Sequence, residues 1–135
     1  MYRKILLALD GSEHSKRAAK HAMELALLVK DSTIQIINVI GYSQTKTEVL
    51  HDELKLKRHE TLEEIEETFQ KANISYSMEF ERGEPGPTIV EYANKERFDL
   101  LIIGSRGLNS LQEMVLGSVS HKVAKRVQCP VLIIK

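Results

Sequence analysis

The sequence alternates regularly between short apolar runs and longer amphipathic stretches, and this alternation restricts the fold more than any other feature of its 135 residues. Each apolar run has the length of a strand, and each longer stretch has apolar residues spaced by three and four, as on one face of a helix. Strands joined through helices lie parallel, and a parallel sheet needs helices on both faces. The pattern therefore predicts an α/β fold, a doubly wound sheet of five parallel strands in a single domain.

The expected boundaries follow from where these patterns stop. Strands are predicted over residues 4–9, 32–40, 74–81, 99–104 and 130–135, and helices over 12–30, about 50–71, 88–96 and 110–127. Ser12 is the expected N-cap of the first helix, and "GEPGP" at 83–87 is expected to be a turn. The third strand alternates apolar and polar residues, which suits an edge of the sheet. Nothing marks a domain boundary, so residues 1–135 are predicted to form one domain.

Charge and cysteine content exclude several classes of protein. The 19 Lys and Arg residues balance the 19 Asp and Glu residues, so no net field attracts nucleic acid or an anionic membrane. The apolar stretch before Asp10 is too short for a signal-peptide core, and no run could span a membrane. We therefore expect a cytoplasmic protein with neither nucleic acid nor a membrane as partner. Cys129 is the single cysteine, which suits a reducing compartment, and its apolar neighbours predict a buried thiol.

A glycine-rich pattern follows the fourth predicted strand, at the edge of the sheet where the strands end. Gly104 and Gly107 are separated by two residues, and nine residues later comes Gly117 followed by Ser118. Glycine admits a ligand close to the main chain, and a helix beginning near Ser118 would offer N–H groups to an anion. The Walker and dinucleotide glycine patterns are absent. From the residues alone, a tight turn with a helix C-cap or kink at Gly117 explains the glycines equally well.

The whole chain resembles the universal stress protein family. The resemblance rests on Asp10 after the first strand, on "DLLIIGSRG", on the spacing G-x2-G-x9-G-S, and on the final "PVLIIK". It implies the strand order 3-2-1-4-5 and an ATP site where the first and fourth strands diverge, which is where open α/β sheets bind ligands. It also implies a homodimer formed by antiparallel pairing of the C-terminal strand.

The resemblance further implies a role for each matching position. Ala8 and Asp10 would lie beside the nucleoside, with Asp10 approaching the ribose or a phosphate-bound Mg²⁺ or Mn²⁺, and the Val39 backbone would contact the adenine edge. Ile103 and Gly104 would line the ribose side. The phosphates would be wrapped by Arg106, Gly107, Gly117, Ser118, Val119 and Ser120. Ala8 departs from relatives that have proline there, with little expected consequence because only backbone and a small side chain are needed.

Some of these residues have competing interpretations. Asp10 can equally cap the following helix through an Asx turn, and Arg106 can be a solvated loop charge. The histidines lack the spacing and the glutamate of a helical zinc site, so they are predicted to be surface residues; they are His14, His21, His51, His59 and His121. No nucleophile elbow is present, and Cys129 precedes a proline at a strand start.

The sequence thus predicts an ATP-binding stress-response protein that works as a nucleotide-dependent regulator or sensor. It supplies a phosphate cradle, but it fixes the position of no glutamate, glutamine or lysine that could orient water. The only enzyme activity that we expect from it is slow ATP hydrolysis at most. Two alternatives stay open. One is a dimeric interaction module without nucleotide dependence, and the other is a slow ATPase.

Overall fold

The computed structural model describes residues 1–41, 48–105 and 117–135, with the side chains of residues 48–54 left out. The strands are β1 (Lys4–Leu9), β2 (Thr33–Ile40), β3 (Tyr76–Arg82), β4 (Leu100–Gly104) and β5 (Val131–Ile134). The helices are α1 (Glu13–Leu28), α2 (Glu48–Lys71), α3 (Pro85–Glu96) and α4 (Ser118–Arg126). Within the described ranges, no helix is long and apolar enough to cross a membrane.

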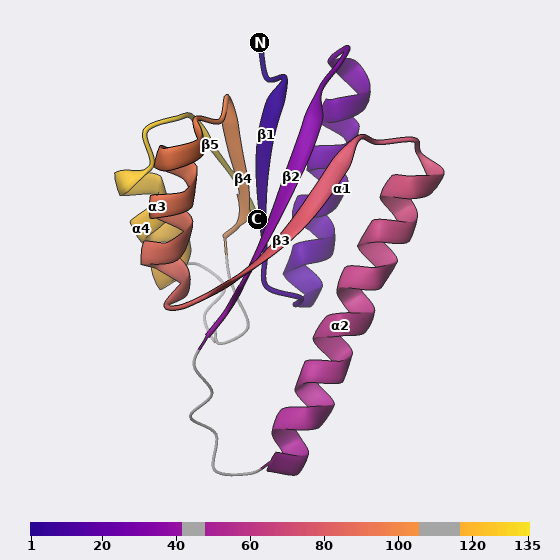
Figure 1. The fold of residues 1–135 in the computed structure, drawn as a ribbon, viewed down its shortest axis with the longest axis vertical. Helices are drawn as coiled ribbons and strands as arrows, with labels where there is room; N and C mark the ends of the chain where they lie inside the picture. The colour runs from indigo at the N-terminus through magenta and orange to yellow at the C-terminus, as the bar shows by residue number, and fades with distance from the viewer. Residues whose placement is uncertain (42–47, 106–116) are drawn as a thin grey trace.

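The five strands form one parallel sheet in the order β3-β2-β1-β4-β5, with β1 at its centre (Figure 1). Ile5 of β1 is level with Ile34 of β2 on one side and with Leu100 of β4 on the other. Because every strand runs the same way, all the carboxyl ends lie at one rim, the lower one in Figure 1. The predicted fold class and strand order are confirmed, and β3 is an edge strand as its alternating pattern predicted.

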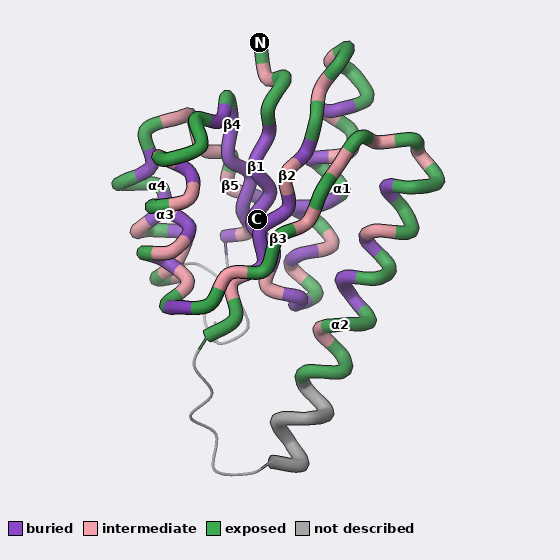
Figure 2. Tube along the Cα trace, in the orientation of Figure 1, coloured by how far each residue is buried: buried purple, intermediate pink, exposed green. Residues whose placement is uncertain are grey.

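The helices cover the two faces in pairs, α1 with α2 and α3 with α4 (Figure 1). Alternate residues of β1 therefore enter two separate cores. Ile5 and Leu7 pack under α1 and α2, whereas Leu6 and Ala8 pack under α3 and α4. Figure 2 shows this buried centre, flanked by helices whose outer sides are exposed. Burial on both faces is what the near-continuous apolar run of β1 predicted.

Two helix starts differ from the predictions. α3 begins at Pro85 rather than at residue 88, so "GEPGP" is mostly helix and not a separate turn. Proline suits the first turn of a helix because its missing N–H needs no partner there. Ser12 does occupy the N-cap position of α1, but its hydroxyl makes no cap bond to the helix. For the helix predicted over 110–127, residues 110–116 lie outside the described residues, and α4 accounts for the rest.

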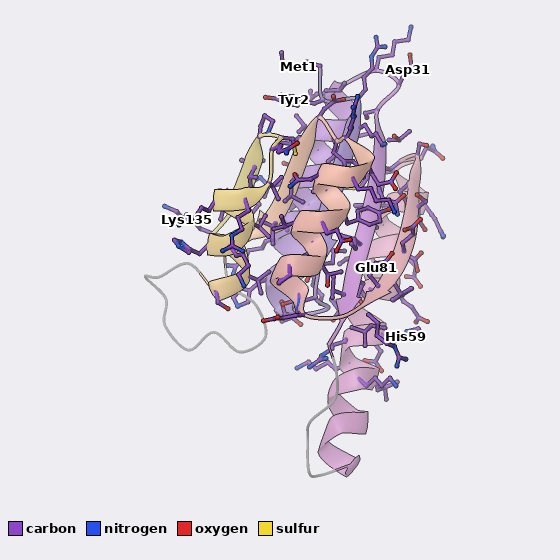
Figure 3. The ribbon with its side chains drawn as sticks, turned by 60° about the vertical axis from the view of Figure 1, so that its left-hand side comes forward. Met1, Tyr2, Asp31, His59, Glu81 and Lys135 are labelled. Atoms are coloured by element: carbon purple, nitrogen blue, oxygen red, sulfur yellow. The ribbon has the colours of Figure 1, made fainter. Side chains whose placement is uncertain are left out.

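Most of the histidines lie at the surface, as predicted, but Cys129 is less buried than predicted. His21, His59 and His121 are exposed and His14 is partly buried, while His51 lies outside the described side chains. Figure 3 shows His59 on the part of α2 that extends beyond the sheet. Cys129 is only partly buried, because it lies in the connection to the edge strand β5. Burial still raises the pKa of its thiol, which favours the neutral form over the nucleophilic thiolate.

Candidate functional site at the carboxyl ends of β1 and β4

The chain leaves the sheet in opposite directions at the ends of β1 and β4. β1 leads into α1 on one face, whereas α4, the next described helix after β4, lies on the other face (Figure 1). Since β1 and β4 are neighbours, this is the point where the strand order reverses. Ligands of open α/β sheets bind in the space that opens at such a point.

Asp10 follows β1 directly, and its carboxylate organises the turn into α1. Oδ1 accepts hydrogen bonds from the Ser12 N–H at 2.9 Å, from the Ser12 hydroxyl at 2.5 Å and from the Ser15 hydroxyl at 2.8 Å. The bond to the N–H two residues ahead is the Asx turn that the sequence allowed. This capping role is observed, and contact of Asp10 with a ligand or a metal stays a prediction.

Ser15, in the first turn of α1, holds the backbone at the end of β1. Its oxygen accepts the N–H groups of Asp10 at 3.0 Å and Gly11 at 3.1 Å, while its proton goes to the Asp10 carboxylate. A hydroxyl has one donor and two acceptor positions, so this set of bonds is complete. Ser15 is 4% exposed as a residue, which makes each of these bonds costly to lose.

Gly11 completes this turn in a conformation that favours glycine. Its φ is +81°, and a Cβ there would lie 2.7 Å from the Cβ of Arg58 on α2. α2 therefore packs closely over the turn. The Nε of Arg58 is buried and has no hydrogen-bond partner among the described residues, so an unsatisfied donor lies on the helix that covers this turn.

The start of α4 is bonded to the end of β4. The Gly117 N–H donates to the Ser105 carbonyl at 2.8 Å, and the Ser120 hydroxyl donates to the Gly104 carbonyl at 2.5 Å. Ser120 is 3% exposed and Gly104 is partly buried, so the second bond is largely shielded from solvent. These two bonds bring together the described parts of the glycine pattern that are far apart in the sequence. Arg106 and Gly107 lie outside the described residues.

Gly117 is the N-cap of α4, which excludes the helix C-cap that the sequence allowed, while contact of Gly117 with a phosphate stays a prediction. Its φ of −62° and ψ of 157° are extended, not the left-handed conformation of a glycine C-cap. The first N–H groups of a helix have no acceptor within it, and here the Gly117 carbonyl first receives the N–H of His121, at 2.9 Å. Ser118, Val119 and Ser120 thus form the positive end of α4 at the rim of the sheet.

Three other predicted residues share one face of the sheet. Ala8 and Ile103 are paired across β1 and β4, and both are buried under α3 and α4. Val39 of β2 is partly buried and packs against the same cluster. The structure therefore places Ala8, Val39 and Ile103 on the α3–α4 side of the rim, where their side chains belong to one apolar cluster.

The backbone of Val39 points toward the side of β1. Along β2 the N–H and carbonyl groups face the two neighbouring strands alternately. The Thr33 N–H donates to the Arg3 carbonyl on the β1 side at 2.7 Å, whereas the Ile40 carbonyl accepts the Gly83 N–H on the β3 side at 3.1 Å. By this alternation the carbonyl of Val39 faces the β1 side.

No β1 residue pairs with that carbonyl. The register between the two strands ends at Leu9 and Asn38, one residue before Val39. In a continued ladder the Gly11 N–H would be the donor, but it is bonded to the Ser15 oxygen. The Val39 carbonyl is therefore an acceptor without a ladder partner in β1, and the Val39 side chain packs against the apolar cluster just described.

Sequence reasoning missed three polar residues of the site, namely Ser15, Asn38 and Ser105. All three are buried, and the Asn38 amide donates to the Leu9 carbonyl at 2.8 Å. Their signals were nevertheless present. Ser15 extends the buried stripe of Ala18, Ala22 and Ala26 toward the rim, and Asn38 continues the inward alternation of Ile34 and Ile36. A polar residue at the end of a buried pattern marks the edge of a core.

The arrangement defines a class of protein, a doubly wound α/β domain in which the chain leaves the central strand and its neighbour toward opposite faces, at the rim where this fold class binds ligands. A family model described as the universal stress protein family matches residues 1–135. The chain is also 32% identical over 142 residues to universal stress protein MJ0531 of Methanocaldococcus jannaschii, covering 100% of this chain and 83% of that protein. This chain belongs to the universal stress protein family.

Solved structures show the same fold over the whole chain. The protein MJ0577 of Methanocaldococcus jannaschii superposes with a TM-score of 0.81 at 30% identity, covering 100% of this chain and 96% of that one. A universal stress protein solved in complex with cAMP superposes with a TM-score of 0.73 at 26% identity, covering 99% and 97%.

The bond between Ser120 and Gly104 can be tested by measuring stability. Ser120→Ala removes the buried donor and leaves the Gly104 carbonyl without it, so the free energy of unfolding should fall by about 1–2 kcal/mol. Urea denaturation without nucleotide measures this change. Ser118→Ala is the matched control, because Ser118 is exposed on the same turn, and its effect should stay within about 0.5 kcal/mol. Equal effects of the two substitutions would contradict the role of Ser120.

Proposed function

We propose that this chain binds ATP at the rim between β1 and β4 and acts as a nucleotide-dependent regulator or sensor in a stress response. The observation that carries this proposal is the pair of bonds that joins the start of α4 to the end of β4, through Gly117 and Ser120. These bonds hold the N-terminus of α4 and the described part of the glycine pattern at the point where the strand order reverses. Proteins of this fold class bind ligands at such a point.

The phosphate end of ATP would lie at the start of α4. Gly104, Gly117 and the N–H groups of Ser118, Val119 and Ser120 would surround it, with Arg106 and Gly107 added on family resemblance. The helix dipole supplies only about 0.3–1 kcal/mol per charge, against the roughly 8 kcal/mol of a micromolar complex. Several charge-assisted hydrogen bonds of about 1.5–3 kcal/mol each are needed, so both glycine groups must contribute. The buried hydroxyl of Ser120 already donates to Gly104, so its contribution comes from its N–H.

The base would lie against the apolar cluster that contains Ala8, Val39 and Ile103. The Val39 carbonyl lacks a ladder partner, so it can accept the exocyclic amino group of adenine. That amino group distinguishes adenine from a base that carries an oxygen at the same ring position. The relative in complex with cAMP supports an adenine nucleotide as the ligand class.

A divalent cation would arrive with the phosphates. Among the described residues, no group of three His, Cys, Asp or Glu side chains could hold a metal ion. Mg²⁺ commonly binds through phosphate oxygens and water with one or two carboxylates, and Asp10 is the carboxylate placed to assist. We propose Mg²⁺ or Mn²⁺ held in this way, and Asp10 beside the ribose or the cation.

The proposed role is regulation rather than turnover, since no described residue of the site is fixed as a base or water-orienting group. Slow ATP hydrolysis is the alternative outcome of the same binding. We place the protein in the cytoplasm, where a single unpaired cysteine stays reduced.

Purification followed by acid release tests the proposal directly. The released material should contain adenine nucleotide, and emptied protein should bind ATP by calorimetry. Gly117→Val should abolish binding because its side chain would occupy the phosphate position, while the fold survives since the extended backbone of Gly117 accepts valine. Gly107→Val should do the same.

Ala124→Val is the matched control, since it adds a similar bulk to an exposed position of α4. It should keep full affinity. If the wild type carries no nucleotide and binds none at up to about 1 mM, where binding is worth only some 4 kcal/mol, the proposal is lost. Wild-type properties in both glycine variants would favour the pure interaction module.

We further propose that the protein is a homodimer through β5. β5 is an edge strand, and its Leu132 side chain is 39% exposed. An exposed edge strand can pair with a strand of another chain. A two-fold axis would pair β5 with β5 of a second copy. Figure 3 marks Lys135 at the end of this strand, on the opposite side of the sheet from Glu81 of β3.

Analytical ultracentrifugation at micromolar protein should give the mass of a dimer. Leu132→Glu should shift the mass toward the monomer, because it places like charges across the axis. Leu28→Glu is the control, since Leu28 is also exposed but lies on α1. A monomeric wild type would refute the proposed dimer.

A further inference from the structure

We infer that Ser15 is a positioning residue for the nucleotide, because its hydroxyl ends the pairing of β1 on both sides and so keeps the Val39 carbonyl open to adenine. The inference rests on the proposed function and adds a specificity determinant to it. Ser15 lies on α1 and belongs to neither the glycine pattern nor the residues matched to the family's site.

On the β4 side of β1, the donor that would continue the ladder is also bonded to Ser15. The N–H groups of Leu101 and Ser105 donate to the carbonyls of Pro130 and Ile134, at 2.9 and 2.7 Å, so these two residues face β5. By alternation, the carbonyl of Gly104 faces β1.

In a continued ladder the donor to that carbonyl would be the Asp10 N–H. That N–H is bonded to the Ser15 oxygen instead, and the Gly104 carbonyl receives the Ser120 hydroxyl. Ser15 thus keeps the Asp10 N–H from the Gly104 carbonyl, the group through which Ser120 holds α4 against β4.

On the β2 side of β1, the same Ser15 oxygen accepts the N–H group of the next residue. The Gly11 N–H, which would continue the ladder to Val39, is 3.1 Å from the Ser15 oxygen. One buried hydroxyl therefore binds the two N–H groups that would extend β1 toward both of its neighbours. Because it also donates to Asp10, it fixes that carboxylate in the same arrangement.

Removal of this hydroxyl has a specific consequence for recognition of the base. Without the Ser15 oxygen, the buried N–H of Gly11 has the Val39 carbonyl as its natural ladder acceptor. A carbonyl bonded to Gly11 competes with the exocyclic amino group of adenine. The expected result is loss of base discrimination, which a general loosening of the fold would not produce.

The test compares ATP with inosine triphosphate, which carries an oxygen in place of the exocyclic amino group. Calorimetric titration should show that the wild type prefers ATP and that Ser15→Ala lowers this preference by about three- to tenfold, the value of one hydrogen bond. Ser12→Ala is the matched control, because Ser12 also donates to Asp10 but accepts neither backbone N–H. Its ATP preference should equal that of the wild type.

Several outcomes would overturn the inference. These are an unchanged preference in folded Ser15→Ala, an equal fall in Ser12→Ala, and a wild type without preference. If Ser15→Ala does not fold, Ser15→Cys, whose thiol is a weak acceptor, takes its place. If the wild type binds neither nucleotide, the proposed function fails and with it the role of Ser15 toward a base. The geometric part is then decided by NMR, where a through-hydrogen-bond coupling between the Gly11 nitrogen and the Val39 carbonyl carbon should appear only in the Ser15 variant.

Discussion

The end of β1 is the constraint on which the rest of the structure depends. β1 is the central strand, buried on both faces and paired on both sides, and its pairing stops at Ala8 toward β4 and at Leu9 toward β2. Because α1 and α4 lie on opposite faces, the sheet opens where β1 stops. In the small cluster of Asp10, Ser12 and Ser15, side-chain oxygens then accept the backbone N–H groups that follow the end of the ladder.

The second half of the site depends on this opening. With the Asp10 N–H bonded to Ser15, the Gly104 carbonyl is available to Ser120, and this bond holds the start of α4 at the rim. The same site thus combines apolar side chains with a carbonyl that has no ladder partner in β1 on the β2 side, and with a helix N-terminus on the β4 side. A ligand with a flat base and a charged tail matches both parts. This match, together with membership of the universal stress protein family, is the basis of the proposed ATP site.

Much of the fold could be predicted from the sequence because buried strands and amphipathic helices leave strong local patterns. The start of α3 was missed because proline and glycine suit both a turn and the first turn of a helix, and only packing decides between them. Strand order needed the family resemblance, since periodicity does not say which strands are neighbours. The burial of Ser15 and Asn38 could be inferred from the apolar pattern, but their function could not, because it depends on backbone register between strands, which a single sequence does not contain.

The central claim is that one adenine nucleotide spans the rim from β2 to the start of α4. The most direct measurement is an NMR titration of isotope-labelled protein with ATP and Mg²⁺. We predict that the largest amide shifts fall together at Val39, Gly104 and Ser118–Ser120, while the amides of β3 and α3 stay nearly unchanged. Absence of shifts, or shifts concentrated away from the ends of β1 and β4, would contradict it.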